Sequence, residues 1–280
     1  MINLVSLLIS ISRRSLVTIW VGIEVSILSF LLILITSNLF QEHNNTVKYF
    51  LFQSICSILL LLRLRLLGEI KMFRIIIIII KLGIAPFHLW FISLMKNITI
   101  LSLIWLSVLQ KIIPLRFIVI IKGNGVLISI LGISLLMSVI YIIIQTKLIN
   151  IIGASSVYSI AWVSMGLISR EQVMWHFFLL YCAFQMFTLR ISFIVSVTPF
   201  KTSFPNSFLR SNIILFATLN IAGFPPSPLF FIKINIITES IARAHLIISL
   251  VIIISARVVM YNYINMRMIL FTRRSRKSGN

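Results

Sequence analysis

The chain has 280 residues, of which 60% are hydrophobic and 11% are charged, and its mean hydropathy is +1.11. Soluble domains are about 25% charged, so this composition indicates a membrane protein with several spans. Basic residues number 25 and acidic residues 5, all glutamate, which gives a formal net charge of +20. The lack of aspartate in the sequence excludes aspartyl-protease, EF-hand and aspartate-based phosphoryl-transfer chemistry.

Polar residues divide the apolar sequence into about ten candidate helices, because a helix needs about 20 apolar residues to cross the hydrocarbon core. The first candidate, 2–12, is too short to span on its own. The others are 15–37, 48–67, 73–94, 98–117, 126–144, 147–168, 172–198, 210–240 and 242–266. We therefore expect an all-α polytopic membrane protein of about ten transmembrane helices, followed by a basic tail at 271–280.

A Gly-Asn-Gly boundary at Gly123 divides these candidates into two halves, 1–122 and 123–270, of five helices each. With an odd number of helices per half, the two repeats would lie inverted in the membrane. The fourth helix of each half contains helix breakers, namely Gly83 and Pro86 in the first half and Gly223, Pro225 and Pro226 in the second. Broken helices at membrane depth belong where protein or water lines a cavity, and matched breaks in two halves predict an ion pathway. Ordinary proline kinks used for packing are the alternative.

Ionisable side chains occur within four of the apolar segments, and they are Glu24, Lys81, Lys111 and Lys233. A charged group near the bilayer centre is costly and is a functional candidate by default. We therefore predict a proton or ion path through these residues, with structural ion pairs as the alternative. His88 lies seven residues after Lys81, on the same predicted helix face, and is a further candidate, although a lone histidine there is more often a packed core residue.

Several motifs carry a family resemblance along most of the chain. The most specific is Lys81-Leu82-Gly83-Ile84-Ala85-Pro86-Phe87-His88-Leu89-Trp90, together with Trp20-Val-Gly-Ile-Glu24, Gln110-Lys111-Ile112-Ile113-Pro114 and Gly223-Phe224-Pro225-Pro226. With these motifs the sequence resembles the antiporter-like membrane subunits of respiratory complex I, the NADH:ubiquinone oxidoreductase. It departs from the family pattern at Asn150 and Ser159, where relatives often carry a basic residue and a histidine, and at Ile232, where relatives have proline.

The resemblance implies a function for the buried residues. Glu24, Lys81, Lys111 and Lys233 would form a row that relays protons through water, and His88 lies where the family also has histidine. The chain itself would hold no metal, flavin, iron–sulfur cluster or quinone site, because the redox chemistry takes place in other subunits of the enzyme. The expected partners are other complex I membrane subunits and phospholipids, including cardiolipin, in the mitochondrial inner membrane.

Two other functions stay open from the sequence, a stand-alone cation/proton antiporter of the same fold and a non-pumping structural subunit. Nucleic acid is not an expected partner, because the cations are scattered among apolar segments rather than gathered on one face. The apolar run at the N-terminus contains neither a cleavable signal nor an Arg-rich transit peptide. Compared with the family, the first helix is short and a last helix after residue 270 is missing.

Overall fold

The structure is a computed structural model that describes residues 2–12, 15–36, 42–66, 71–95, 98–121, 125–145, 148–169, 171–197, 212–213, 216–225, 227–243 and 246–278. All regular structure in these ranges is helical, which confirms the predicted fold class. Five described helices are long and apolar enough to cross a membrane, namely Leu16–Thr36, Ile100–Ile120, Gly125–Ile144, Ile149–Ile168 and Leu246–Asn265. A multi-pass membrane protein is therefore supported, and the total of about ten crossings stays a prediction.

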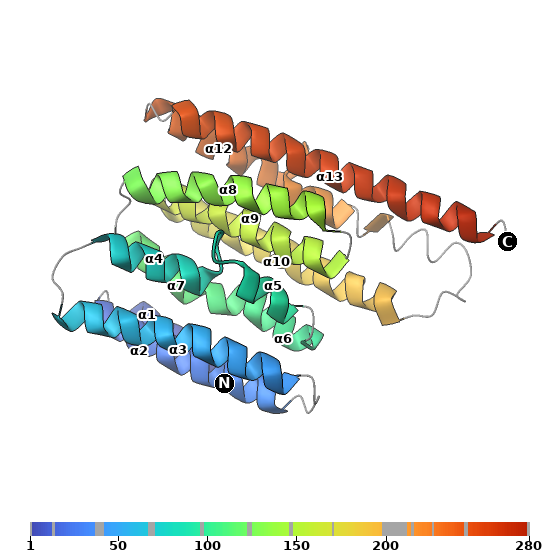
Figure 1. The fold of residues 1–280 in the computed structure, drawn as a ribbon. Coiled ribbons are helices and arrows are strands. Elements are labelled where there is room, and N and C mark those ends of the chain that lie inside the picture. Colours follow the sequence, from blue (N-terminus) through green and yellow to red (C-terminus); the bar gives the residue numbers. More distant parts are fainter. Residues whose placement is uncertain are drawn as a thin grey trace.

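The first part of the chain forms a series of neighbouring helices at one end of the molecule (Figure 1). They are α1 (Ile2–Ser12), α2 (Leu16–Thr36), α3 (Glu42–Leu66), α4 (Lys71–Leu82) and α5 (Leu89–Met95), followed by α6 (Ile100–Ile104), the π-helical turn η1 (Trp105–Leu109) and α7 (Gln110–Ile121). Helix α2 packs between α1 and α3, and α4 packs between α3 and α7. The break between α4 and α5 falls inside the predicted segment 73–94, at its glycine and proline residues.

The second part contains α8 (Gly125–Ile144), α9 (Leu148–Ser169), α10 (Glu171–Val197), a helical segment at 216–222, α12 (Pro228–Ala242) and α13 (Leu246–Ser278). Helix α13 lies along α8 and α12 at the other end of the molecule (Figure 1). It continues well beyond the predicted end at residue 266. The reason is that its last turns are rich in arginine and lysine, which are good helix formers, and contain no glycine or proline before Gly279.

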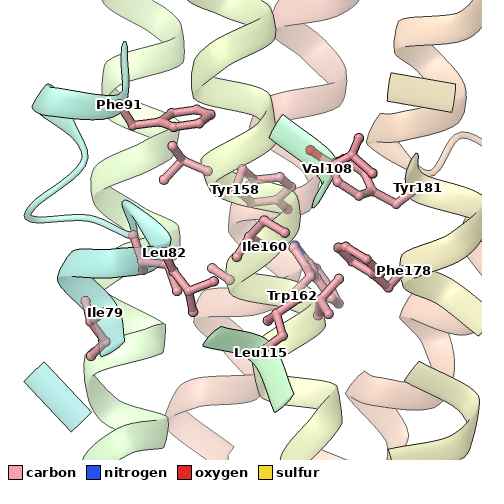
Figure 2. Close-up of a cluster of buried hydrophobic side chains, with 14 of the residues drawn as sticks. Ile79, Leu82, Phe91, Val108, Leu115, Tyr158, Ile160, Trp162, Phe178 and Tyr181 are labelled. Atoms are coloured by element: carbon pink, nitrogen blue, oxygen red, sulfur yellow. The ribbon is translucent and has the colours of Figure 1, made fainter. Parts of the chain in front are cut away.

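Helix α9 is the central element of the fold. Within Ile149–Ile168, 94% of an apolar 18-residue window is buried inside the molecule, whereas within Leu246–Asn265 of α13 only 28% of such a window is buried. Small residues such as Gly153, Ala154 and Ala161 allow neighbouring helices to approach closely, and α9 contacts α5, α7, α8, α10 and α12. Figure 2 shows Tyr158 and Trp162 of α9 at the centre of the buried cluster.

Large apolar side chains cover much of the outer surface. Leu8, Leu101 and Leu179 are each 65% exposed, and Ile247 is 79% exposed. Soluble monomers rarely expose contiguous apolar surface on this scale, so these side chains fit a hydrocarbon surrounding.

Candidate functional site

The first helix break ends α4 with a Schellman motif. The Gly83 N–H donates to the Ile80 carbonyl at 3.1 Å, and the Ile84 N–H donates to the Ile79 carbonyl at 3.1 Å. Gly83 has φ of +65°, a left-handed conformation that residues with a Cβ rarely adopt. Pro86 lies in the turn that follows, and α5 begins at Leu89. The carbonyls at the end of α4 are therefore hydrogen-bonded inside the bundle, and the Ile80 carbonyl also accepts from the Trp90 indole N–H at 3.1 Å.

The second break has the same backbone pattern. The Gly223 N–H donates to the Asn220 carbonyl at 3.1 Å, the Phe224 N–H donates to the Leu219 carbonyl at 3.0 Å, and Gly223 has φ of +85°. Pro225 follows in the turn, whereas Pro226 lies outside the described residues. Helix α12 starts at Pro228, and the Ser227 side chain caps it by accepting from the Phe230 N–H at 3.3 Å. The two parts of the chain thus interrupt a helix by equivalent hydrogen bonds.

Lys81 sits on the last turn of α4 with its side chain only 5% exposed. Its ammonium donates to the Gln53 carbonyl of α3 at 3.3 Å, and the Gln53 amide donates back to the Lys81 carbonyl at 3.4 Å. Glu24, half-buried on α2, interacts electrostatically with Lys81 without a direct ion pair. One turn before Glu24, the Trp20 indole N–H donates to the Ser57 carbonyl at 2.9 Å and fixes α2 against α3.

Lys111 is 3% exposed and follows an irregular turn. The π-helical turn η1 ends at Leu109, immediately before α7, and such turns are frequent at functional sites. Pro114 inside α7 lacks the N–H that an α-helix would use to bond the Gln110 carbonyl. The Lys111 ammonium donates to the Ser156 hydroxyl of α9 at 3.4 Å and lies 4.4 Å from the centre of the Phe91 ring.

Lys81 and Lys111 line one cavity. It is small, with room for about one water molecule, and its other polar lining residues are Tyr49, Gln53 and Gln110. The Tyr49 hydroxyl donates to the Gln110 side-chain oxygen at 3.2 Å, and the Gln110 amide donates to the Ser26 carbonyl of α2 at 3.1 Å. The structure therefore joins the two lysines, and it connects their cavity to the helix that carries Glu24.

Lys233 lies away from that cavity, on the α12 side of α9. Its ammonium donates to the Ile221 carbonyl at 3.0 Å and to the Ala222 carbonyl at 2.7 Å, the last carbonyls of the segment 216–222. The rings of Tyr158 and Trp162 on α9 have their centres 5.4 Å and 5.2 Å from the same nitrogen. A cation at a helix C-terminus is stabilised by the helix dipole, so Lys233 caps the helix end at the second break.

His88 takes a separate position after the first break. Its Nδ1 lies 3.2 Å from the Pro86 carbonyl, and its ring packs edge-on against Tyr141 of α8 at 5.0 Å. Its Nε2 is buried and has no hydrogen-bond partner among the described residues. The cavity between Lys81 and Lys111 is not lined by His88.

Sequence reasoning assigned no role to Tyr49, Gln53 and Gln110, although each lines the cavity. Tyr49 and Gln53 are spaced i, i+4 and so share one face of α3, and Gln110 is adjacent to Lys111. This spacing of polar residues within an apolar helix was the available signal. Nothing in the sequence around Trp105 indicated the π-helical turn.

Comparison with known proteins finds similar sequences among respiratory-enzyme chains and similar folds among chains of membrane complexes. The sequence is 29% identical to NADH-ubiquinone oxidoreductase chain 2 of Artemia franciscana, over 95% of this chain and 88% of that protein. It is 26% identical to NADH-ubiquinone oxidoreductase chain 2 of Anopheles gambiae, over 94% of this chain and 82% of that protein. A search of protein-family models finds no match.

The fold is similar to chains of two membrane complexes. A chain of respiratory complex I from Thermus thermophilus superimposes with a TM-score of 0.78 at 16% identity, over 95% of this chain and 68% of that chain. A chain of the Mrp complex from Dietzia sp. DQ12-45-1b superimposes with a TM-score of 0.78 at 13% identity, over 95% of this chain. This chain spans 58% of the length of the Mrp complex chain. The chain therefore shares the fold of these two membrane-complex chains.

Proposed function

We propose that this chain, similar over most of its length to NADH-ubiquinone oxidoreductase chain 2, is a core membrane subunit of respiratory complex I in the mitochondrial inner membrane. In this role it takes part in proton translocation coupled to electron transfer from NADH to ubiquinone. The similarity to two chain 2 proteins over 94–95% of the sequence supports the assignment. The mitochondrial location follows from the names of these relatives.

The observation that carries the proton-transfer role is the cavity shared by Lys81 and Lys111. Two amines on one polar cavity influence each other, because a proton on one raises the electrostatic energy of a proton on the other. Protonation of one lysine would therefore expel a proton from its neighbour. Tyr49, Gln53 and Gln110 supply donors and acceptors, and the cavity has room for about one water molecule that they could bind.

Glu24 would exchange protons with Lys81 at one end of the row. It is half-buried on α2 and acts electrostatically on Lys81. Lys233 would form the other end, beyond α9, and its two hydrogen bonds to carbonyls hold its ammonium in one position. His88 stays a further proton carrier in this proposal, since its Nε2 is buried and available.

The proposed architecture has two inverted five-helix repeats with about ten crossings. The equivalent Schellman motifs at Gly83 and Gly223 support this repeat. We expect the redox groups to lie in other subunits, and the exposed apolar surface to contact neighbouring membrane subunits and phospholipids, including cardiolipin. The similarity to chains of two multi-subunit complexes supports assembly with other membrane subunits.

A stand-alone cation/proton antiporter of the same fold is the second candidate, because the complex I chain and the Mrp complex chain match this fold with the same TM-score and fold similarity does not separate the two functions. Native electrophoresis of mild detergent extracts separates the two functions. Migration with NADH dehydrogenase activity in a large complex supports the respiratory subunit, whereas migration as a small oligomer supports the antiporter. A third candidate is a non-pumping structural subunit. In that case the complex should move the normal number of protons per quinone reduced even after Glu24, Lys81, Lys111 and Lys233 are all replaced by neutral residues.

The variant Lys81→Met tests the proton-transfer role in the assembled complex. We expect proton transfer and coupled quinone reduction to fall by roughly tenfold or more, in line with the loss of a proton-transfer group. Lys48→Met is the matched control, because Lys48 is an exposed lysine on α3. Full coupled activity of Lys81→Met in a normally assembled complex would refute the proposal.

A further inference from the structure

Helix α13 lies along the outer edge of the molecule, where it packs against α8 and α12 on one side (Figure 1). Its other side, which we call the α13 face, is exposed along the whole apolar span Leu246–Asn265. Together with Arg257, the exposed residues follow one another at intervals of three or four, so they form one stripe along the helix. The apolar members of the stripe are Ile247 at 79% exposed, Leu250 at 60%, Ile254 at 58%, Tyr261 at 63% and Ile264 at 46%.

Arg257 interrupts this apolar stripe near its middle. Its side chain is exposed, and it has no ion pair or hydrogen bond with any residue that the structure describes. A charged group near the bilayer centre is costly, and such groups are almost always paired or face the interior of a bundle. The position of Arg257 therefore requires a source of negative charge beside the α13 face.

Lipid headgroups do not supply this charge, because both ends of the span are too far away. Arg257 lies eight residues before Asn265 and eleven residues after Leu246. At the rise of an α-helix these separations are about 12 Å and about 16 Å. An extended arginine side chain reaches only about 7 Å from its Cα. The guanidinium therefore stays at the depth of the lipid tails, which carry no charge.

The chain itself does not supply the charge either. Helix α13 contains no acidic residue. The acid nearest in sequence, Glu239, lies before the turn that leads into α13 and pairs with Arg243 at 3.9 Å. A second copy of the chain that packed through the same face would bring two Arg257 side chains together, and like charges repel each other.

We propose that the α13 face docks a transmembrane helix of another subunit, and that this helix carries an aspartate or glutamate at the depth of Arg257. The carboxylate accepts two parallel hydrogen bonds from the guanidinium, which is the geometry that arginine offers. The apolar residues on both sides of Arg257 exclude lipid from the ion pair and give the partner helix a continuous contact. This inference rests on the proposed function, since that function supplies a complex of several membrane subunits.

Three variants of Arg257 test the ion pair in the full complex. Arg257→Met removes the charge, Arg257→Lys keeps it and Arg257→Glu reverses it. Arg273→Met is the matched control, because it removes one charge from the same helix beyond the end of the span. The readout is the amount of assembled complex on native electrophoresis, relative to the total amount of the chain in the membrane.

We expect Arg257→Met to lower the assembled complex by roughly tenfold or more, because the partner's carboxylate is left buried and unpaired. Arg257→Glu should abolish assembly, whereas Arg257→Lys and Arg273→Met should retain most of it. An arginine that faces lipid predicts the opposite, since its replacement by Met removes a charge from hydrocarbon and leaves assembly equal or better. That result overturns the proposal, as does an Arg257→Lys variant that assembles no better than Arg257→Met, or an equal loss in Arg273→Met.

Chemical crosslinking identifies the partner group. A hydrophobic carbodiimide activates carboxyl groups inside the membrane, and the lysine amine of the Arg257→Lys variant then displaces the urea to form an amide bond. We expect mass spectrometry to find this bond between position 257 and an aspartate or glutamate in a transmembrane segment of another subunit. The absence of a crosslink at position 257, or a crosslink to an acid of this chain or of a second copy, refutes the proposal.

Failure of the proposed function gives a different result from failure of this inference. If the unchanged chain migrates apart from NADH dehydrogenase activity, the proposed function fails, whatever position 257 contacts. If the unchanged chain migrates with that activity and Arg257→Met assembles normally, only the docking of a partner helix on the α13 face is refuted.

Discussion

The two helix breaks have the same backbone hydrogen bonds, but their lysines are placed differently. At both, a glycine with positive φ ends a helix by the same pair of hydrogen bonds. At the first break, Lys81 belongs to the helix that ends, and its ammonium reaches across to α3 at 3.3 Å and faces a cavity. At the second, Lys233 belongs to the helix that begins, and its ammonium folds back onto the last two carbonyls at 3.0 Å and 2.7 Å.

This difference follows from the order of lysine and break along the chain. A helix C-terminus presents free carbonyls and negative dipole charge, which a cation stabilises. Lys233 follows the break and can satisfy those carbonyls, whereas Lys81 precedes the break on the same helix and projects away from its end. We infer that Lys233 holds its break together in addition to its proposed place in the proton row, whereas Lys81 has no comparable capping role at its own break.

The largest expected effect on stability comes from Lys233→Met, and comparison with Lys81→Met tests whether the two lysines differ in their structural role. Loss of Lys233 leaves two buried carbonyls without their charged donor, and we expect a destabilisation of about 3 kcal/mol. Loss of Lys81 removes one long bond to Gln53 and should cost about 1 kcal/mol. Thermal unfolding of the assembled complex measures both.

The same two variants should also differ in assembly and in proton transfer. Lys81→Met should assemble at a normal level and lose proton transfer, whereas Lys233→Met should lose assembled complex first. Equal losses of stability in the two variants would contradict a special capping role for Lys233. Met keeps the length of the apolar side chain in both cases, so packing volume is matched.

Replacement of the two glycines by alanine is expected to have an intermediate effect. Left-handed φ costs about 1–2 kcal/mol for a residue with a Cβ, and that cost is common to Gly83→Ala and Gly223→Ala. A Cβ at Gly83 would lie 3.0 Å from the Phe91 Cβ, which is fixed to the backbone. A Cβ at Gly223 would lie 3.0 Å from the Lys233 Cδ, in a side chain that can shift.

We therefore expect Gly83→Ala to destabilise the complex by about 2 kcal/mol or more and Gly223→Ala to cost less. Gly132→Ala is the control, because a Cβ there meets no atom within 4 Å and alanine favours the helix. A larger loss of stability for Gly223→Ala would mean that the Lys233 side chain cannot shift away from the added Cβ. That result would support the role of Lys233 in holding the second break together. The measurement is the thermal midpoint of each variant.

Part of this site could be predicted from the sequence because its signals are local. Gly83, Pro86 and Gly223 restrict the backbone wherever they occur in an apolar helix, and a lysine within such a helix is conspicuous. The breaks and the buried lysines could therefore be located without coordinates.

The partners of these lysines could not be predicted, because they depend on which helices meet. Lys81 reaches Gln53, 28 residues away, and Lys111 reaches Ser156, 45 residues away. Serine and glutamine are common within membrane helices, so the sequence can mark a polar helix face but cannot say which lysine each residue contacts before the helices are packed. For the same reason, Lys81 and Lys233 look equivalent in the sequence, because each lies beside a helix break. Only the hydrogen bonds of their ammonium groups show that they differ.

The smallest expected effect concerns the start of α12, the other side of the second break. The Ser227 hydroxyl accepts from the Phe230 N–H at 3.3 Å, so Ser227→Ala removes a helix cap and should cost about 1 kcal/mol in the thermal unfolding of the complex. Ser240→Ala in the same helix is the control, because that hydroxyl donates to the Ile237 carbonyl and caps nothing. If both variants have equal stability, the cap contributes little and Lys233 alone fixes the second break. If Ser227→Ala is less stable, the capping of α12 and the ammonium of Lys233 secure the two sides of that break together.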